Sequence, residues 1–182
     1  MIAAFDISTS TLGYTILDDK GKIVELNHLD LKKTSGFFEC ADKFAELCDS
    51  LKKKYKLTFI AVEAPKKNFA FGKTSVDTIV LLLRFNGVCC YILRDRFGIE
   101  PIMISEGHAR TMCGLKFKNL LNDKGKKIPR KEQAFAQMML KPEFKDWPWE
   151  FKRTGRIKDY HLDQMDSYII GKSFYEEYMP KE

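Results

Sequence analysis

The sequence has few cysteines and histidines, the residues that form disulfide frameworks and zinc sites. Its 182 residues include five cysteines and three histidines, and neither a CxxC pair nor the ligand spacing of a zinc site occurs. Cys89 and Cys90 are adjacent within an apolar stretch, where a free thiol behaves as a small hydrophobic side chain. We therefore expect reduced cysteines and a cytoplasmic protein rather than a disulfide-stabilised secreted one.

Long hydrophobic runs, internal repeats and low-complexity segments are also missing. Apolar runs such as Ile79 to Leu83 are much shorter than the ~20 residues that cross a bilayer. No basic segment followed by an apolar one, as in a secretory signal, comes after Met1. We expect no membrane association and a single domain over residues 1–182, because this length suits one domain.

Charge of neither sign dominates the composition, but the basic residues are unevenly distributed. Lys and Arg number 31 against 25 Asp and Glu, which gives a net charge of +6. Residues 110–131 contain Asp123 as their one acid and these basic residues: Arg110, Lys116, Lys118, Lys124, Lys126, Lys127, Arg130 and Lys131. Clustered positive charge binds the phosphates of nucleic acids, although a solvated loop and helix start have the same pattern.

The distribution of hydrophobic residues predicts an α/β fold. Residues 2–6, 13–17 and 22–26 form three antiparallel strands in this interpretation, with a turn at 18–21. Two further strands, 57–62 and 101–105, are expected to be parallel. Helices are predicted over 37–51, 74–97, 108–115, 129–142 and 160–178. Because strands and helices alternate in the second half, we expect a five-stranded mixed sheet flanked by helices.

Four acidic residues stand at the ends of predicted apolar elements. Asp6 ends the first strand, Glu63 follows strand 57–62, and Asp163 and Asp166 share one face of the last helix. Acids beside apolar runs are costly to bury alone, and carboxylates from several elements form an oxygen-rich site that suits Mg²⁺ or Mn²⁺. Two such ions promote phosphodiester hydrolysis. Taken singly, each acid also fits a turn, cap or helix-dipole role.

Three segments together resemble the motifs of RuvC-type Holliday junction resolvases, which belong to the RNase H-like superfamily. These segments are Phe5 to Tyr14, Ala61 to Glu63 and His161 to Ser167. Their order, with a long predicted helix after the second, extends the resemblance over nearly the whole chain. One departure is Ser167, which stands where family members often have alanine.

The resemblance implies an RNase H-like fold and a structure-selective DNA endonuclease. Such an enzyme would resolve Holliday (four-way) junctions as a homodimer, by paired symmetric nicks that leave 5′-phosphate and 3′-hydroxyl ends. Asp6, Glu63, Asp163 and Asp166 would be the ligands of two Mg²⁺ ions per active site, with Mn²⁺ able to substitute. Lys131 would be the basic catalytic residue beside them.

Basic, hydroxyl and aromatic side chains elsewhere are candidates for contacts with branched DNA. Phe69 and Phe71 lie among lysines after Glu63, where aromatic rings stack on unpaired bases or anchor a loop to the core. Helix 74–97 is apolar nearly all round, which suits a second subunit or full burial. The complete set of candidate contacts is Ser8, Thr9, Lys66, Lys67, Phe69, Phe71, Lys73, Arg110, Lys116, Lys118, Lys126, Lys127, Arg130, Arg153 and Arg156.

Three other functions are compatible with parts of the pattern. A broader branched-DNA endonuclease, acting on flaps or forks, would use the same acids. A non-catalytic junction-binding module would require the loss of an acid, whereas all four positions are acidic. A nucleotide phosphotransferase of the actin-like or sugar-kinase type has a similar first phosphate loop, but that fold needs two domains and a second Gly-rich motif.

Overall fold

The computed structural model, which describes residues 1–65, 75–121 and 125–180, is built on one mixed sheet with the strand order β3-β2-β1-β4-β5. Strands β1 (Ile2–Asp6), β2 (Thr11–Leu17) and β3 (Ile23–Asp30) pair in antiparallel fashion. Strand β4 (Phe59–Glu63) is parallel to β1, and β5 (Ile102–Ile104) is parallel to β4. This confirms the predicted five-stranded mixed sheet.

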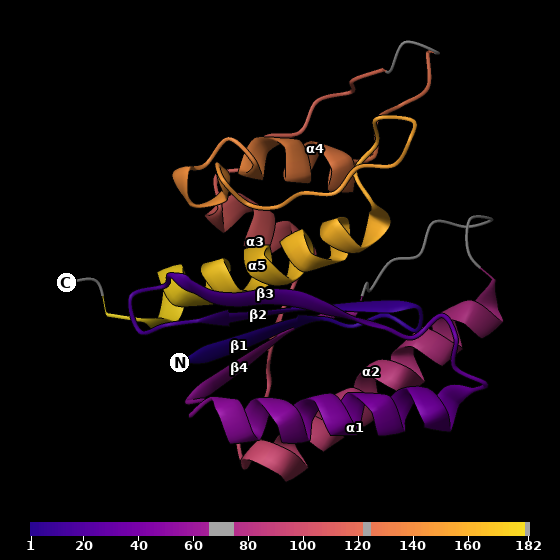
Figure 1. The fold of residues 1–182 in the computed structure, drawn as a ribbon, viewed down its shortest axis with the longest axis vertical. Helices are drawn as coiled ribbons and strands as arrows, with labels where there is room; N and C mark the ends of the chain where they lie inside the picture. The colour runs from indigo at the N-terminus through magenta and orange to yellow at the C-terminus, as the bar shows by residue number, and fades with distance from the viewer. Residues whose placement is uncertain (66–74, 122–124, 181–182) are drawn as a thin grey trace.

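Helices cover both faces of the sheet (Figure 1). One face carries α1 (Phe37–Lys54) and α2 (Val76–Phe97), and the other carries α5 (Asp159–Tyr178). Helices α3 (Glu106–Met112) and α4 (Arg130–Met138) lie on the side of α5. Helix α4 ends earlier than predicted, and a 3₁₀ turn, Pro142–Phe144, follows it.

The side chains of β1 alternate between the two faces. Ala3 and Phe5 pack in the core beneath α1 and α2, whereas Ile2 and Ala4 pack in the core beneath α5. Because successive side chains of a strand point to opposite faces, the same alternation directs Asp6 toward α5. The first predicted acid thus faces the helix that carries two of the others.

Strand β4 repeats this arrangement in the neighbouring position of the sheet. Ala61 packs in the core of the α5 face, and Val62 packs in the opposite core. The alternation therefore places Glu63 on the α5 face as well. Since β1 and β4 are parallel, both strands deliver their acids at the same edge.

Two glycines allow α5 to lie directly on the sheet. Gly13 pairs with Asp6 across β1 and β2, and a Cβ atom at Gly13 would stand 2.0 Å from the backbone oxygen of Asp163. Further along the helix, a Cβ atom at Gly171 would stand 2.9 Å from that of Ala4. The absence of a side chain at Gly13 therefore lets the first turns of α5 reach Asp6.

The five cysteines are free, as the sequence predicts. Four of them are buried and Cys90 is half-buried. Burial raises the pKa of the Cys48 thiol to about 12 and that of the Cys113 thiol to about 11. The Cys48 and Cys113 thiols therefore have little thiolate character and pack as apolar side chains.

We expect Gly13→Ala to destabilise the protein, because a methyl group at this position has to displace the backbone of α5. The expected loss in free energy of unfolding is about 3 kcal/mol or more, as for severe overpacking, and urea denaturation measures it. Gly87→Ala in α2 is the control, since its Cβ would meet no atom within 4 Å. Equal stability of the two variants would contradict the close approach of α5.

Candidate active site

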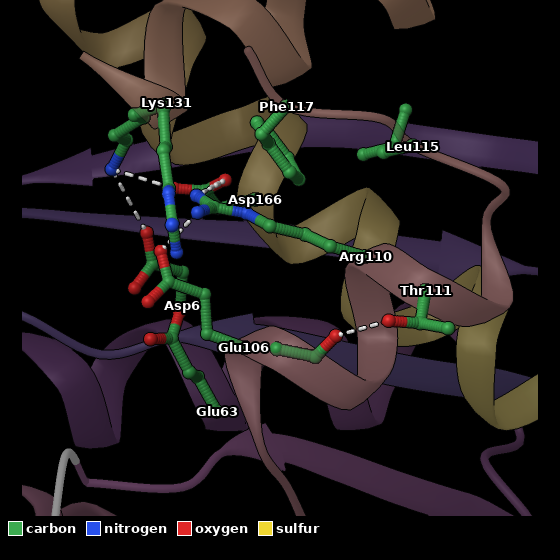
Figure 2. A pocket seen from close by; sticks show the side chains of 11 residues that line it. Asp6, Glu63, Glu106, Arg110, Thr111, Leu115, Phe117, Lys131 and Asp166 are labelled. Carbon is green, nitrogen blue, oxygen red and sulfur yellow. Dashed lines mark hydrogen bonds and ion pairs between the residues drawn. The ribbon is translucent and has the colours of Figure 1, made fainter. Parts of the chain in front are cut away.

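Three carboxylates converge on Lys131 where the first turns of α5 meet the end of β1. The Lys131 Nζ atom lies 2.7 Å from Asp163 Oδ1, 2.9 Å from Asp166 Oδ2 and 3.4 Å from Asp6 Oδ2. Figure 2 shows the ammonium reaching down from α4 toward Asp6 and Asp166. Four residues that the sequence singled out, from three different elements, thus meet at one point.

Glu63 joins these residues by lining the same cavity. The cavity has a volume of about 910 Å³, and Asp6, Glu63, Asp166 and Lys131 form part of its wall (Figure 2). The rest of the wall comes from α3, the segment after it and the start of α4: Glu106, Gly107, Arg110, Thr111, Leu115, Phe117 and Arg130. One wall is therefore acidic, and basic side chains stand beside it.

The acids of this cluster are poorly solvated. The side chain of Asp6 is 13% exposed. Burial raises its pKa to about 6, and the charges of Asp166 and Asp163 act in the same direction while Lys131 opposes them. Burial also raises the pKa of Asp163. The ionised forms of these two carboxylates are therefore disfavoured by burial and favoured by the positive charge of Lys131 beside them.

Lys131 is held in its charged form by the same cluster. Burial alone would lower its pKa, but the carboxylates of Asp6, Asp166 and Asp163 raise it above the ordinary value. Lys131 is consequently a charged ammonium ion at neutral pH, and it donates to carboxylates rather than accepting protons.

Arg110, a candidate DNA contact from the basic stretch, lines the cavity from within the protein, and its contact with DNA stays a prediction. It is buried, and its guanidinium lies 3.3 Å from Asp166 Oδ1 and 2.6 Å from Glu106 Oε1. Arg110 therefore pairs with the acidic cluster from within the protein. The i,i+4 spacing of Glu106 and Arg110 is a signal for their ion pair, whereas the contact with Asp166 joins distant parts of the chain.

The remaining basic candidates are at the surface wherever the structure describes them. Arg130 is exposed at the mouth of the cavity. Arg156 is exposed and forms an ion pair with Glu132. The other exposed members are Lys116, Lys118, Lys126, Lys127 and Arg153. Lys66, Lys67, Phe69, Phe71 and Lys73 lie outside the described residues.

The two hydroxyl candidates belong to the turn between β1 and β2. Ser8 Oγ accepts a hydrogen bond from the Thr11 N–H at 3.1 Å and donates one to the Thr11 carbonyl at 2.7 Å. Thr9 is half-buried and lines a second cavity, of about 420 Å³, beside Phe37 and Leu81. Ser8 thus holds the turn that follows Asp6, and its contact with DNA stays a prediction.

The donor set has the chemistry of a site for a hard divalent cation. Asp6, Glu63, Asp163 and Asp166 offer carboxylate oxygens, which Mg²⁺ prefers. In the part of the chain that the structure describes, no group of three Asp, Glu, His or Cys side chains is arranged to hold one ion, and Lys131 lies among three of the carboxylates. An ion bound by these oxygens requires the ammonium to leave them.

Comparison with known proteins gives a fold but no close sequence relative. Neither a protein-family model nor a curated protein sequence matches the chain. RuvC of T. thermophilus in complex with a Holliday junction substrate matches with a TM-score of 0.66 at 9% identity, over 96% of this chain and 92% of that chain. The chain has the RuvC fold.

Two further structures agree with this result. T. thermophilus RuvC in a second structure matches with a TM-score of 0.57 at 12% identity, over 96% of this chain and 93% of that chain. The yeast mitochondrial Holliday junction resolvase Ydc2 also gives 0.57, at 15% identity, over 96% of this chain and 77% of that chain. The RNase H-like topology predicted from the sequence is therefore confirmed, and the acids at the ends of β1 and β4 belong to a RuvC-like sheet.

We expect Asp6→Asn to stabilise the metal-free protein above pH 6 and to have little effect near pH 4. The pKa of Asp6 is about 6 in the folded state against an ordinary 3.8. Between these values the folded state retains a proton that the unfolded state has lost, so this group lowers stability as pH rises. The gain at pH 7 is at most about 3 kcal/mol.

Urea denaturation in EDTA from pH 4 to pH 8 measures this difference. Asp42→Asn is the control, because Asp42 is exposed on α1, on the opposite face of the sheet. The control should follow the wild-type curve. A difference between Asp6→Asn and wild type that does not change with pH would contradict the assignment.

Proposed function

We propose that this protein is a structure-selective DNA endonuclease that resolves four-way junctions by paired symmetric nicks. The observation that carries the proposal is the convergence of Asp6, Asp163 and Asp166 on one cation, in a cavity that Glu63 also lines. The RuvC fold supports the proposal, since the T. thermophilus protein of that fold was solved with a Holliday junction substrate.

The four carboxylates have the role of metal ligands in this proposal. Asp6, Glu63, Asp163 and Asp166 would hold Mg²⁺, two ions per active site, with Mn²⁺ able to replace it. Bound there, such ions activate a water molecule and stabilise the leaving oxygen of a phosphodiester. The chain itself positions the ligands in two ways. The alternation of side chains along β1 and β4 directs Asp6 and Glu63 to the α5 face, and the close approach of α5 brings Asp163 and Asp166 to them.

The basic side chains of the cavity complement a phosphate. Arg110 forms an ion pair with the Oδ1 atom of Asp166. Arg130 is exposed at the cavity mouth, where its positive charge attracts the DNA backbone. Lys131 and Arg110, the two basic side chains that form ion pairs with Asp166, differ in access, because the Lys131 side chain is 33% exposed and the Arg110 side chain is 7% exposed.

A homodimer is part of the proposal because α2 presents an apolar stripe to the exterior. Val76, Val80, Leu83 and Tyr91 are 73%, 45%, 43% and 68% exposed, and their spacing places them along one side of the helix. The opposite side of α2 packs in the core with α1. A second copy that covers the stripe would remove this apolar surface from water.

A membrane is the other environment that such a helix fits. Among the described residues one helix, α2, is long and apolar enough by length and composition to cross a bilayer, with 22% of the tested window buried. Helices in the cores of soluble proteins pass the same test. Because α2 packs against α1 beside the sheet (Figure 1), we assign its exposed stripe to a second subunit.

We expect the protein to nick a synthetic four-way junction in Mg²⁺ at symmetric positions on two strands. Asp166→Asn should reduce the nicking rate by at least about a thousandfold, because it removes a ligand charge that the reaction needs in its transition state. Denaturing gels that map each nick to the nucleotide measure the result. Asp42→Asn is the matched control and should cut like wild type.

The same assay separates the alternative functions. Comparable cleavage of flaps and forks would indicate the broader branched-DNA endonuclease. Junction binding without cleavage, in either Mg²⁺ or Mn²⁺, would overturn the proposed catalysis and indicate a binding module.

We expect Leu83→Arg to convert a homodimer into monomers, because it places a charge in the middle of the exposed stripe of α2. Sedimentation equilibrium of the two proteins measures their mass. Lys127→Met, at an exposed position away from α2, should leave the mass unchanged. A monomeric wild-type protein at micromolar concentration would contradict the assignment of this face.

A further inference from the structure

Two cations contact Asp166, and they are held in very different ways. The Arg110 side chain is 7% exposed and is fixed between Asp166 and Glu106. The Lys131 side chain is 33% exposed, lines the cavity, and forms its ion pairs with Asp6, Asp163 and Asp166. Arg110 is therefore a permanent part of the interior, whereas the Lys131 ammonium is at the end of a flexible stem beside open space.

The oxygens that Lys131 occupies are the ones that a divalent cation would need. Asp163 Oδ1, Asp166 Oδ2 and Asp6 Oδ2 all lie within 3.4 Å of its Nζ atom. Carboxylates that converge on an ammonium ion cannot converge at the same time on a metal ion, since two cations at one position repel each other. Occupation by Lys131 and occupation by a divalent cation are thus alternatives.

Without any cation beside them, these carboxylate oxygens would repel one another. Burial and the mutual repulsion of Asp6, Asp163 and Asp166 already raise the pKa of Asp6 in the presence of Lys131. Removing the ammonium would leave three carboxylates in a poorly solvated site, which destabilises the fold. Lys131 therefore stabilises the metal-free protein and competes with the metal ion.

We propose that Lys131 is an internal counter-ion of the metal-free site, which a divalent cation displaces and a DNA phosphate then binds. The inference rests on the proposed function, because it assumes a divalent cation at these acids. Once displaced, the ammonium moves into the cavity, where Arg130 also stands. A phosphate that binds it there favours the displaced position, so DNA and metal strengthen each other's binding.

The affinity for Mn²⁺ in the absence of DNA tests the exchange directly. Lys131→Met keeps the length of the stem and removes the charge, so it should bind Mn²⁺ at least about tenfold more tightly, because the metal ion no longer has to displace a cation from the carboxylates. Electron paramagnetic resonance of free Mn²⁺ measures the affinity. Lys53→Met removes an exposed charge on α1, on the opposite face of the sheet, and should bind Mn²⁺ like wild type. Unchanged or weaker binding by Lys131→Met would overturn the proposal.

Thermal unfolding gives an independent readout. In EDTA, Lys131→Met should melt below wild type, because its carboxylates lack a counter-ion. Saturating Mn²⁺ should then raise its melting temperature by more than it raises that of wild type. Equal shifts in the two proteins would contradict the counter-ion role.

A short DNA duplex tests the second half of the proposal by supplying phosphates without a branch point. It should tighten Mn²⁺ binding to the wild-type protein and do so less in Lys131→Met. An equal gain in both proteins would show that the phosphate does not act through Lys131, and it would overturn that step.

Two results keep this inference separate from the proposed function. If wild type and Lys131→Met both fail to bind millimolar Mn²⁺, the metal-dependent function itself is wrong. If both bind Mn²⁺ equally, only the exchange is overturned. Should Lys131→Met not fold, nuclear magnetic resonance of the wild-type Lys131 ε-methylene group decides, because the signal should move on addition of Mg²⁺ and a stationary signal would exclude displacement.

Discussion

The direct contact of α5 with strands β1 and β2 is the constraint on which the site depends. A helix usually stands off a sheet by the thickness of the side chains between them, but Gly13 and Gly171 leave no such spacer. Ser167 adds a polar contact to this seam. Its hydroxyl donates to the Gln164 carbonyl and pairs with Thr15 Oγ1, both at 2.7 Å. The serine that departs from the family pattern is thus buried and hydrogen-bonded within this contact.

Close packing of this kind brings carboxylates together in a place with little water, where burial and mutual repulsion raise the pKa of Asp6. Two cations offset this repulsion: Arg110, which is buried, and Lys131, which is half-buried. Arg110 neutralises Asp166 from the side of α3, while Lys131 reaches the cluster from α4. The modest net charge of +6 conceals this arrangement, because acids and bases cancel within the site while lysines remain exposed around it.

The parts of this site that follow from local rules could be predicted from the sequence. The alternation of β1 fixes the face of Asp6, the end of an apolar strand fixes Glu63, and an i,i+3 spacing puts Asp163 and Asp166 on one side of a helix. The meeting of Lys131 with these acids was suggested by the family resemblance alone, and the structure shows the contact.

Contacts between distant segments could not be predicted in the same way. Arg110 belongs to a basic stretch predicted to bind DNA, yet its side chain is buried on α3, which packs against α5. Glu106, which lines the cavity, has the sequence pattern of an acid in the first turn of a helix. Both roles depend on the packing of α3 against α5, a contact between segments far apart in the sequence that no local periodicity encodes.

This fold depends on the identity of few individual residues, so two chains can share it at low sequence identity. Most of the sheet requires only that apolar side chains alternate between two cores, which many residues satisfy. In this chain the stringent requirement of the packing is a glycine beneath α5, because a Cβ atom at Gly13 would meet the backbone of Asp163. Because so few positions need a particular residue, two chains can share this architecture and differ almost everywhere else.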